Sequence, residues 1–356
     1  MNREQMNQFL ITPNASIVDV MRQIDLNSSG IVYVVDEEDK LLGSLTDGDI
    51  RRWLIKTADL SGDILGIMNV APKVIYQQDV ASAQEIIEKY EINSIPVVDA
   101  RGILIDIILE EQENIDKKPK KRLEDVPVII MAGGKGTRLY PFTKILPKPL
   151  IPIGDIPIIE RIMNRFCGFG MNDYYITVNY RKNMIRSYFN DIAQKYNIIY
   201  VEEDKPLGTA GSIQLIEDKF DKPLFVTNCD ILIDADYTDI YKYHVESGNV
   251  LTIVSALKNI VVPYGVINAK EDGVVLSMDE KPKLSYFVNT GMYVVNPEAL
   301  ELIPEDTFYH MTDLSDELLK RGERVGMYPI SEESFLDMGE FEEMRRMEDK
   351  LNIKAE

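Results

Sequence analysis

The residues best suited to chemistry follow the apolar run at residues 128–131, in the segment AGGKGTR. Its three glycines, Gly133, Gly134 and Gly136, allow the backbone to bend closely around a phosphate and to direct N–H groups at it. The segment is neither a Walker A loop nor a Gly-x-Gly-x-x-Gly motif. A glycine cluster alone is equally typical of an ordinary turn between a strand and a helix.

Two cations near the glycine loop make a phosphate site more specific. Arg138 ends the loop, and Lys148 lies within LPKPL, where proline restricts the backbone on both sides. Two fixed cations beside a glycine loop suit a triphosphate. The longer pattern GGKGTRL…PKPLIPIGDIPII resembles the signature of sugar-1-phosphate nucleotidyltransferases, and the resemblance runs from about Val126 to Leu351. It implies that a nucleoside triphosphate is joined to a sugar 1-phosphate with release of pyrophosphate.

The resemblance implies a role for each motif residue that binds the nucleotide. The catalytic cations would be Arg138, Lys148 and Lys281, and the triphosphate would lie against Ala132, Gly133, Gly134, Gly136 and Thr137. In EEDKPLGTAGSI, Gly208 falls where the family contacts the base through its backbone, and Glu203 falls where uridylyl and thymidylyl members have Gln. A carboxylate only accepts hydrogen bonds, which suits the N1–H and N2–H₂ donors of guanine. We therefore expect GTP; the alternative is that Glu203 points to solvent.

Two aspartates are expected to hold Mg²⁺. Asp230 ends the segment LFVTNCD, where the family usually has Gly in place of Cys229, and Asp337 lies in SFLDMGEFEEM, which resembles the family's W-x-D-x-G-T-P with departures. An aspartate after a strand is otherwise more often a turn former. Two carboxylates that share one hard cation beside a triphosphate are typical of magnesium chemistry.

Three short segments, YGV, EKP and NTG, resemble the motifs that bind the sugar in this family. They imply that Lys281 meets the sugar phosphate as a point charge and that the sugar is bound by Gly265, Glu280, Asn289 and Thr290. Any one of these segments is also typical of a turn or a surface ion pair. The two histidines, His244 and His310, match no motif and are assigned no role.

The part of the chain before the glycine loop contains one unit twice. The first copy reads as a helix, ASIVDVMRQI, with Ser16 as a candidate cap, and then as strand, turn and strand in SSGIVYVVDEEDKLLGSLT. The second copy repeats this order in VASAQEIIEKY and NSIPVVDARGILIDIIL. The segment INSIPVVD resembles the signature of CBS domains, so residues 5–112 resemble a tandem CBS pair. Such pairs commonly regulate or assemble a protein, and we expect a homo-oligomer.

A nucleotide site in this pair depends on the motif Ser/Thr-x-x-Asp, which holds ribose in CBS domains. In LTDGDIRR, Thr46 and Asp49 match the motif, and the carboxylate could accept both ribose hydroxyl protons of an adenine or guanine nucleotide. The alternative is a capping box, in which Thr46 caps a helix and Asp49 returns the bond. The second copy lacks the motif.

The charged segment EEQENIDKKPKKRLEDVP predicts a linker, and we expect CBS domains at residues 1–121 and a transferase domain at residues 122–356. The transferase region alternates strands with helices, which predicts an α/β domain with a Rossmann-like mixed sheet, similar to glycosyltransferase-A folds, after an α+β CBS pair. Strands are expected at 128–131, 174–178, 198–201, 224–227, 250–255 and 288–295, and helices at 156–166, 182–189, 210–216 and 237–247. Ligands of such sheets bind beyond the carboxyl ends of the strands.

Composition limits the partners of this 356-residue chain. Its formal net charge of −20 argues against nucleic acid or an anionic membrane as the main partner, because phosphate groups need a compensating basic surface. The apolar runs are too short to cross a bilayer, and the two cysteines make neither a metal-type spacing nor a disulfide framework. A cytoplasmic enzyme is the expectation.

The identity of the sugar is the least determined feature of the sequence. The fusion of a CBS pair to this transferase resembles bacterial guanylyltransferases that act on glucosamine 1-phosphate in nonulosonic (legionaminic) acid synthesis. Mannose-1-phosphate guanylyltransfer and glucose-1-phosphate uridylyl- or thymidylyltransfer are alternatives. A nucleotide-sensing CBS protein that retains an inactive transferase scaffold is an alternative of a different class.

Overall fold

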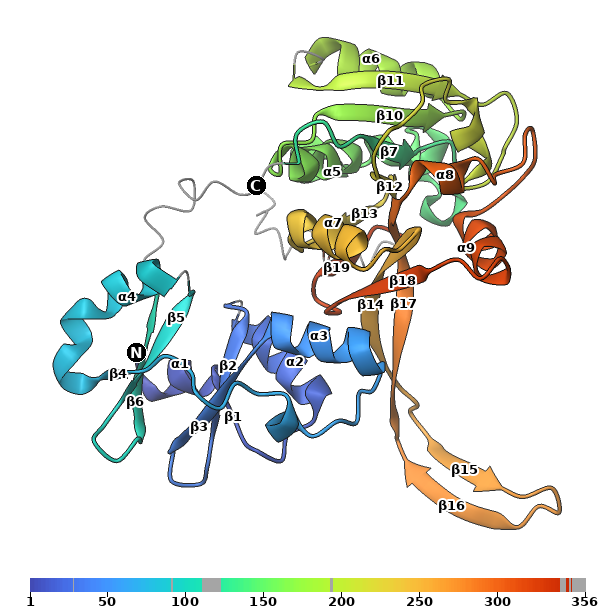
Figure 1. The fold of residues 1–356 in the computed structure, drawn as a ribbon. Coiled ribbons are helices and arrows are strands. Elements are labelled where there is room, and N and C mark those ends of the chain that lie inside the picture. The colour runs from blue at the N-terminus through green and yellow to red at the C-terminus, as the bar shows by residue number, and fades with distance from the viewer. Residues whose placement is uncertain are drawn as a thin grey trace. The chain divides into compact units, whose positions relative to one another are not determined.

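Figure 1 shows the computed structural model, which describes residues 1–27, 29–90, 92–110, 123–192, 195–339, 344–345 and 347. The chain divides into two compact units, Met1–Lys118 and Pro119–Glu356. Most of the linker predicted at residues 110–127, with the boundary between residues 121 and 122, falls on residues 111–122, outside the described residues. The boundary therefore stays a prediction.

The N-terminal unit contains two small sheets of the same topology. In each sheet the first two strands are parallel and the last two are antiparallel. The strands are β1 (Leu10–Ile11), β2 (Ile31–Val35) and β3 (Leu41–Thr46), then β4 (Ile75–Tyr76), β5 (Ser94–Val98) and β6 (Leu104–Leu109). The α-helices described in this unit are α1 (Arg3–Asn7), α2 (Ile17–Asn27), α3 (Asp47–Thr57) and α4 (Ala83–Tyr90). The repeat in the sequence is therefore also a repeat in the structure.

Equivalent side chains shape the two copies. Asp36 and Asp99 each follow a strand directly, and each accepts two backbone hydrogen bonds, at 2.8 to 3.0 Å, that turn the chain into the antiparallel partner. Ser16 caps α2 as expected, because its Oγ accepts the Asp19 N–H at 3.1 Å. The hydroxyls of Tyr33 and Ser94 lie 2.8 Å apart, and the copies share a buried apolar core.

The candidate nucleotide motif of the first copy forms a capping box at the start of α3. Thr46 Oγ1 accepts the Asp49 N–H at 3.2 Å, and Asp49 Oδ2 accepts the Thr46 N–H at 2.9 Å. Arg51 pairs with Asp47, and Arg52 pairs with Asp49. The capping alternative is thus present in the structure, and ribose binding by Thr46 and Asp49 stays a prediction.

The C-terminal unit is built on a seven-stranded mixed sheet, which confirms the predicted fold class (Figure 1). β7 lies between β10 and β12 and is parallel to both, whereas β17 is antiparallel to β12 and β14. In sheet order the strands are β11 (Asn197–Glu202), β10 (Asp173–Val178), β7 (Val128–Met131), β12 (Leu224–Asn228), β17 (Lys283–Val295), β14 (Leu251–Val261) and β18 (Val325–Ile330). The carboxyl ends of β7 and β12 adjoin, because Met131 pairs with Asn228.

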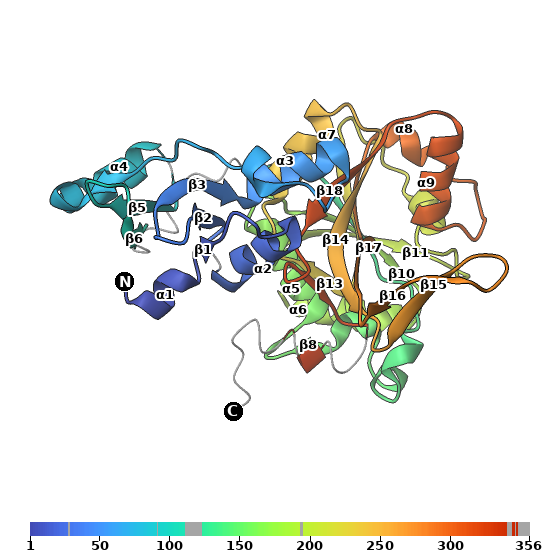
Figure 2. The ribbon, with the colours of Figure 1, turned by 90° about the horizontal axis from the view of Figure 1, so that it is seen from below.

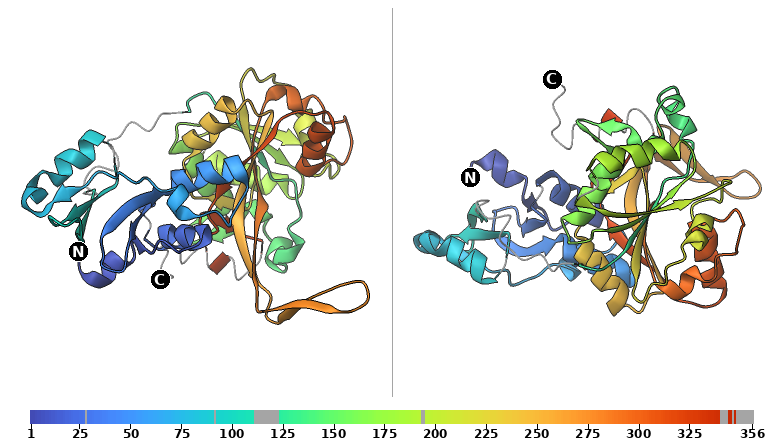
Figure 3. Two further views of the ribbon diagram at one scale, coloured as in Figure 1. Left: turned by 60° about the horizontal axis from the view of Figure 1, so that its bottom comes forward. Right: turned by 90° about the horizontal axis from the view of Figure 1, so that it is seen from above.

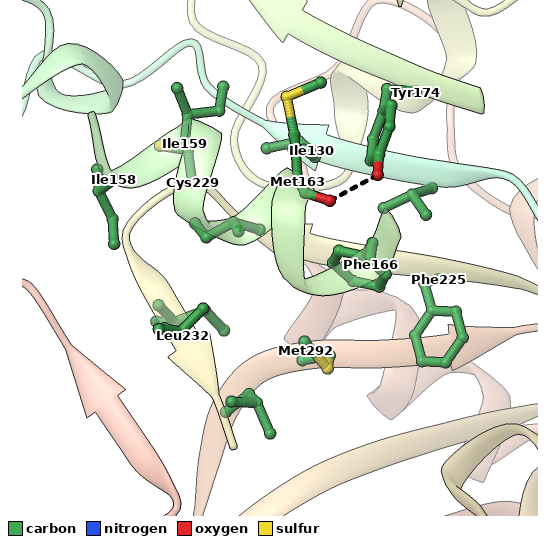
Figure 4. Packing of buried hydrophobic residues seen from close by; sticks show 14 of the residues in the cluster. Ile130, Ile158, Ile159, Met163, Phe166, Tyr174, Phe225, Cys229, Leu232 and Met292 are labelled. Atoms are coloured by element: carbon green, nitrogen blue, oxygen red, sulfur yellow. Dashed lines mark hydrogen bonds between the residues drawn. The ribbon is translucent and has the colours of Figure 1, made fainter. Parts of the chain in front are cut away.

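Helices cover both faces of this sheet, with α5 and α6 on one face and α8 and α9 on the other (Figure 3). Alternation along β7 explains this, since Val128 and Ile130 belong to the core under α5 while Ile129 packs with α9. Figure 4 shows the first core, in which the Tyr174 hydroxyl donates to the Met163 carbonyl at 2.8 Å. The helices are α5 (Ile158–Cys167), α6 (Lys182–Ile192), α7 (Tyr237–Glu246), α8 (Pro297–Leu300) and α9 (Met311–Lys320).

Shorter elements surround the carboxyl edge of the sheet. The 3₁₀ turns lie at Thr137–Leu139, Phe142–Lys144, Lys148–Leu150 and Gly211–Leu215, and the short strands are β8 (Pro152–Ile153), β9 (Ile156–Pro157), β13 (Ile231–Ile233) and β19 (Phe335–Asp337). The α-helix predicted at 210–216 is wrong: this segment is the 3₁₀ turn Gly211–Leu215. Its bonds join residues three apart, since the Ile213 N–H donates to Ala210 O and the Ile216 N–H donates to Ile213 O.

One hairpin extends beyond the sheet from the ends of β14 and β17 (Figure 2). It consists of β15 (Gly265–Ala269) and β16 (Val275–Glu280), and nearly all of its residues are exposed. Among the described residues, no helix has the length and apolar character needed to cross a membrane.

Candidate active site

The glycine loop after β7 is shaped by what its glycines contact. An added Cβ atom at Gly133 would lie 2.4 Å from Glu203 Oε1, and one at Gly136 would lie 2.9 Å from Lys148 Cβ. Gly136 also has φ of +63°, a conformation that other residues rarely adopt. The two glycines therefore let the loop pass directly over the Glu203 carboxylate and the stem of Lys148.

Lys148 and Asp230 form an ion pair beneath the loop. Lys148 begins a 3₁₀ turn between two prolines and is only 8% exposed, while Asp230 follows β12. A buried ammonium group needs a partner of opposite charge, and this carboxylate supplies it. The sequence thus placed two chemically complementary groups far apart along the chain, and the adjoining ends of β7 and β12 bring them together.

The two predicted metal ligands lie on neighbouring chain segments. Asp337 ends β19, where it pairs in register with Ile231, the residue after Asp230. The Met338 N–H donates to the Asp230 carbonyl at 2.8 Å. The Arg138 guanidinium borders the same position, because an added Cβ atom at Gly339 would lie 3.1 Å from Asp337 Oδ2 and 3.3 Å from Arg138 Nη1.

These residues suit Mg²⁺ by their chemistry. Within the described part of the chain, no group of three or more His, Cys, Asp or Glu side chains could hold a metal by itself. Magnesium usually takes one or two protein carboxylates together with phosphate oxygens and water. Asp230 and Asp337 supply two such carboxylates at one cavity. Burial raises the pKa of the neighbouring Cys229 to about 12, so that side chain stays a neutral thiol.

Two adjoining cavities open at this edge of the sheet. The first has a volume of about 410 Å³ and is lined by the glycine loop, Lys148, Glu203 and residues 206–209. The second has a volume of about 440 Å³ and is lined by Asn289, Thr290, Asp337 and their neighbours. Both cavities are bordered by Arg138, Thr209, Asn228, Asp230 and His310. A ligand that spans both would therefore pass the shared cation and carboxylate.

Glu203 lines the first cavity and does not point to bulk solvent. It is 6% exposed, and its Oε2 accepts the Leu207 N–H at 3.4 Å. Burial raises the pKa of this carboxyl group, while the bond from Leu207 and the hydroxyls of Ser212 and Thr177 oppose the rise. The solvent-exposed alternative is wrong.

The loop after Glu203 is held by a distant segment. Gly208 has φ of +82°, and an added Cβ atom there would lie 2.4 Å from the Tyr309 carbonyl oxygen. The Tyr309 N–H donates to Leu207 O at 2.9 Å, and Tyr309 O accepts the Ala210 N–H at 2.9 Å. Residues 207–210 are thus clamped by backbone contacts, and glycine at 208 is required by both the conformation and the contact.

The predicted sugar residues fall into two groups. Asn289 and Thr290 line the second cavity, although the Thr290 hydroxyl already donates to Val254 O at 2.7 Å. Gly265, Glu280 and Lys281 lie at the base of the exposed hairpin and line neither cavity. Sugar binding by the hairpin residues therefore stays a prediction that requires the hairpin to approach the cavities.

Sequence reasoning missed three polar residues at the junction of the cavities: Thr209, Asn228 and His310. Asn228 packs against Gly291, where an added Cβ atom would lie 2.3 Å from its Nδ2. Asn228 directly precedes Cys229 and Asp230, and Thr209 lies within LGTAG. Both residues could therefore have been predicted as site residues from the motifs next to them. Nothing near His310 in the sequence indicated its place.

Two family models match the chain. Residues 127–353 match the family described as nucleotidyl transferase, and residues 6–56 match the CBS domain, the first of the two predicted copies. A UTP–glucose-1-phosphate uridylyltransferase of Synechocystis sp. is 35% identical over 54% of this chain and 55% of its own length. A mannose-1-phosphate guanyltransferase of Candida albicans is 34% identical over 49% of this chain and 51% of its own length. The chain thus spans about half the length of these curated relatives.

A solved structure is similar to most of the chain. HddC from Yersinia pseudotuberculosis has 26% sequence identity and a TM-score of 0.50, and the match covers 64% of this chain and 99% of that one.

Proposed function

Because this chain belongs to the nucleotidyl transferase family, we propose that it joins a nucleoside triphosphate to a sugar 1-phosphate and releases pyrophosphate. The observation that carries the proposal is the meeting of Arg138, Lys148, Asp230 and Asp337 at the junction of two cavities. The first cavity adjoins a glycine loop suited to phosphates, and the second can take the acceptor. Relatives named as uridylyl- and guanyltransferases of sugar phosphates support this reaction.

In the proposed mechanism, an oxygen of the sugar phosphate attacks the α-phosphorus of the triphosphate. A new P–O bond forms as the bond from the α-phosphorus to the bridging oxygen of the β-phosphate breaks, and pyrophosphate leaves with that electron pair. The nucleophile is already ionised, so no covalent enzyme intermediate is required. Catalysis then depends on positioning and charge neutralisation. Arg138 and Lys148 neutralise the phosphates, and Lys281 anchors the acceptor phosphate if the hairpin reaches the site.

Asp230 and Asp337 would hold Mg²⁺, which neutralises phosphate charge when bound. In the structure the Lys148 ammonium group pairs with the Asp230 carboxylate. A cation held by Asp230 would leave the Lys148 ammonium group available to a phosphate oxygen. The ion pair thereby holds the buried Lys148 side chain beneath the glycine loop.

We propose GTP as the nucleotide. Glu203 presents a buried carboxylate to the first cavity, beside the clamped loop at residues 207–210. A carboxylate can accept hydrogen bonds from both N1–H and N2–H₂ of guanine, whereas uracil and thymine offer a donor and an acceptor. Relatives named as guanyltransferases support this choice. UTP or dTTP is the second candidate, favoured by the relative named as a uridylyltransferase.

Glucosamine 1-phosphate is the proposed acceptor, supported by the fused CBS architecture. Mannose 1-phosphate and glucose 1-phosphate are the competing acceptors, supported by the names of the relatives. Pyrophosphate release should be measured for four nucleoside triphosphates against a panel of sugar 1-phosphates. The proposal expects turnover only when both substrates are present, greatest with GTP. If no pair turns over, a nucleotide-binding protein with an inactive scaffold becomes the better account.

The CBS region would regulate or assemble the enzyme as a homo-oligomer. Asp49 is the proposed ribose ligand, and Asp49→Asn keeps an oxygen that can accept the Thr46 backbone N–H. Titration with adenine and guanine mononucleotides should show weaker binding for Asp49→Asn than for the matched control Asp47→Asn, which changes a carboxylate two positions away. Equal binding by both variants would remove the ribose site.

A further inference from the structure

We propose that His310 binds the acceptor sugar, by donating a hydrogen bond from its Nε2–H to a sugar hydroxyl oxygen. This inference rests on the proposed function, because it assigns the second cavity to the sugar. His310 was given no role by its sequence context, yet it borders both cavities. Of the residues two positions before and after His310, Phe308 lines the first cavity and Thr312 lines the second.

The tautomer of His310 is determined by Thr209. The Thr209 N–H points at His310 Nδ1, with 3.3 Å between the nitrogens, and Thr209 Oγ1 also lies 3.3 Å from Nδ1. Thr209 Oγ1 accepts the Met311 N–H at 3.1 Å, which leaves its own hydroxyl proton free to donate to Nδ1. Since Nδ1 faces two donors, it must act as an acceptor, and the neutral ring carries its proton on Nε2.

The Nε2–H group is then a fixed donor with no protein partner. None of the described residues accepts a hydrogen bond from it. The ring is oriented by an edge contact with Phe308, with 4.8 Å between ring centroids, and the His310 backbone N–H is held by Asp313 Oδ2 at 2.8 Å. A held donor at a cavity wall suits an acceptor on the ligand.

The position of His310 favours the sugar over the nucleotide. The glycine loop, Lys148 and Glu203, which we assign to the nucleotide, line the first cavity and not the second. The second cavity contains Asn289 and Thr290, whose side-chain oxygens already accept backbone N–H bonds from Gly291 and Met292. His310 therefore supplies a free side-chain donor where a pyranose hydroxyl would enter.

Two substitutions separate this role from a structural one. Asn at 310 puts an amide oxygen where Nδ1 lies, so His310→Asn can keep the bond from Thr209 but removes the Nε2 donor. Gln puts an amide N–H₂ where Nε2 lies, so His310→Gln can keep the donor but removes the Nδ1 acceptor. If His310 binds the sugar, His310→Asn should raise KM for the sugar 1-phosphate about tenfold, the loss expected for one hydrogen bond. His310→Gln should stay within about threefold of wild type.

The KM for the nucleotide is the second readout, and it should change less than about twofold in both variants. Deoxy sugar phosphates identify the contact: the analogue that lacks the hydroxyl bound by His310 should be used equally well by wild type and His310→Asn. The opposite ranking, with His310→Gln impaired and His310→Asn normal, would mean that His310 only holds the loop at Thr209. A rise in nucleotide KM alone would also overturn the inference. Absence of wild-type turnover with every sugar phosphate would instead refute the proposed function.

Discussion

Replacement of Glu203 by Gln tests how the base is read. The change keeps the size of the side chain but converts a group that only accepts hydrogen bonds into one that offers a donor and an acceptor. Glu203 is 6% exposed behind Gly133, so neither form can turn to solvent to relieve a mismatch. One of the two carboxylate oxygens that would accept from guanine is replaced by an amide N–H₂ group. That group would then face one of the N–H donors of guanine.

The expected loss follows from the strength of that contact. A hydrogen bond to a charged group contributes about 1.5–3 kcal/mol, and an opposed pair of buried donors adds a desolvation penalty. We take about 3 kcal/mol, which lowers kcat/KM for GTP roughly a hundredfold. The same variant should use UTP and dTTP better than wild type does. Its preference should therefore move from GTP toward UTP and dTTP, and not only weaken.

Stability distinguishes this effect from damage to the fold. Burial raises the pKa of Glu203, so its ionisation opposes folding once the pH exceeds the ordinary glutamate pKa of about 4.3. Glu203→Gln removes that charge and should melt no lower than wild type at about pH 8, with the difference vanishing in acid. The matched control is Glu202→Gln, one residue earlier, where the carboxylate pairs with lysine and arginine at the surface. An unchanged GTP preference in Glu203→Gln, measured by pyrophosphate release, would refute guanine reading by this residue.

Three further variants test the role of Lys148, the clamped loop at residues 207–210 and the buried His244. Lys148→Met keeps the apolar stem of the side chain and should lower kcat more than a hundredfold in the pyrophosphate assay. The control Lys144→Met changes an exposed lysine and should leave kcat near the wild-type value. Equal activities of the two variants would contradict a catalytic role for Lys148. Gly208→Ala should lower the free energy of unfolding by about 1–3 kcal/mol and raise the KM for the nucleotide, because the new methyl group meets the Tyr309 carbonyl at a positive φ; a denaturant titration identical to wild type would show that the loop is not clamped. Burial lowers the pKa of His244, so the wild-type protein should lose stability as the pH falls through the unfolded histidine pKa of about 6.5. His244→Gln should lose less stability over the same range. If the melting temperatures of both proteins fall equally from pH 8 to pH 5, this prediction is wrong.

Much of the fold could be predicted because its core strands are short apolar runs. All four residues of β7 are buried, and the predicted range 128–131 matches the strand. Strands that leave the core were predicted too short: β14 was expected to end at residue 255 but continues to Val261, where its residues are exposed. An exposed strand carries no apolar run from which its length could be predicted.

Lys148 and Asp230 could be named as candidate site residues because each lies in a motif that resembles the family's. What could not be predicted depends on contacts between distant segments. The burial of Glu203 results from the close approach of Gly133, and the orientation of His310 results from Thr209, about a hundred positions earlier. No periodicity or spacing within either segment contains that information.

Attack of a sugar-phosphate oxygen on the α-phosphorus of the nucleotide can be followed with a sugar 1-phosphate that carries heavy oxygen (¹⁸O) in its non-bridging phosphate positions. The products are weighed by mass spectrometry. We expect the nucleoside diphosphate sugar to keep every labelled oxygen and pyrophosphate to carry none. Labelled pyrophosphate, or formation of pyrophosphate without a sugar nucleotide, would contradict it.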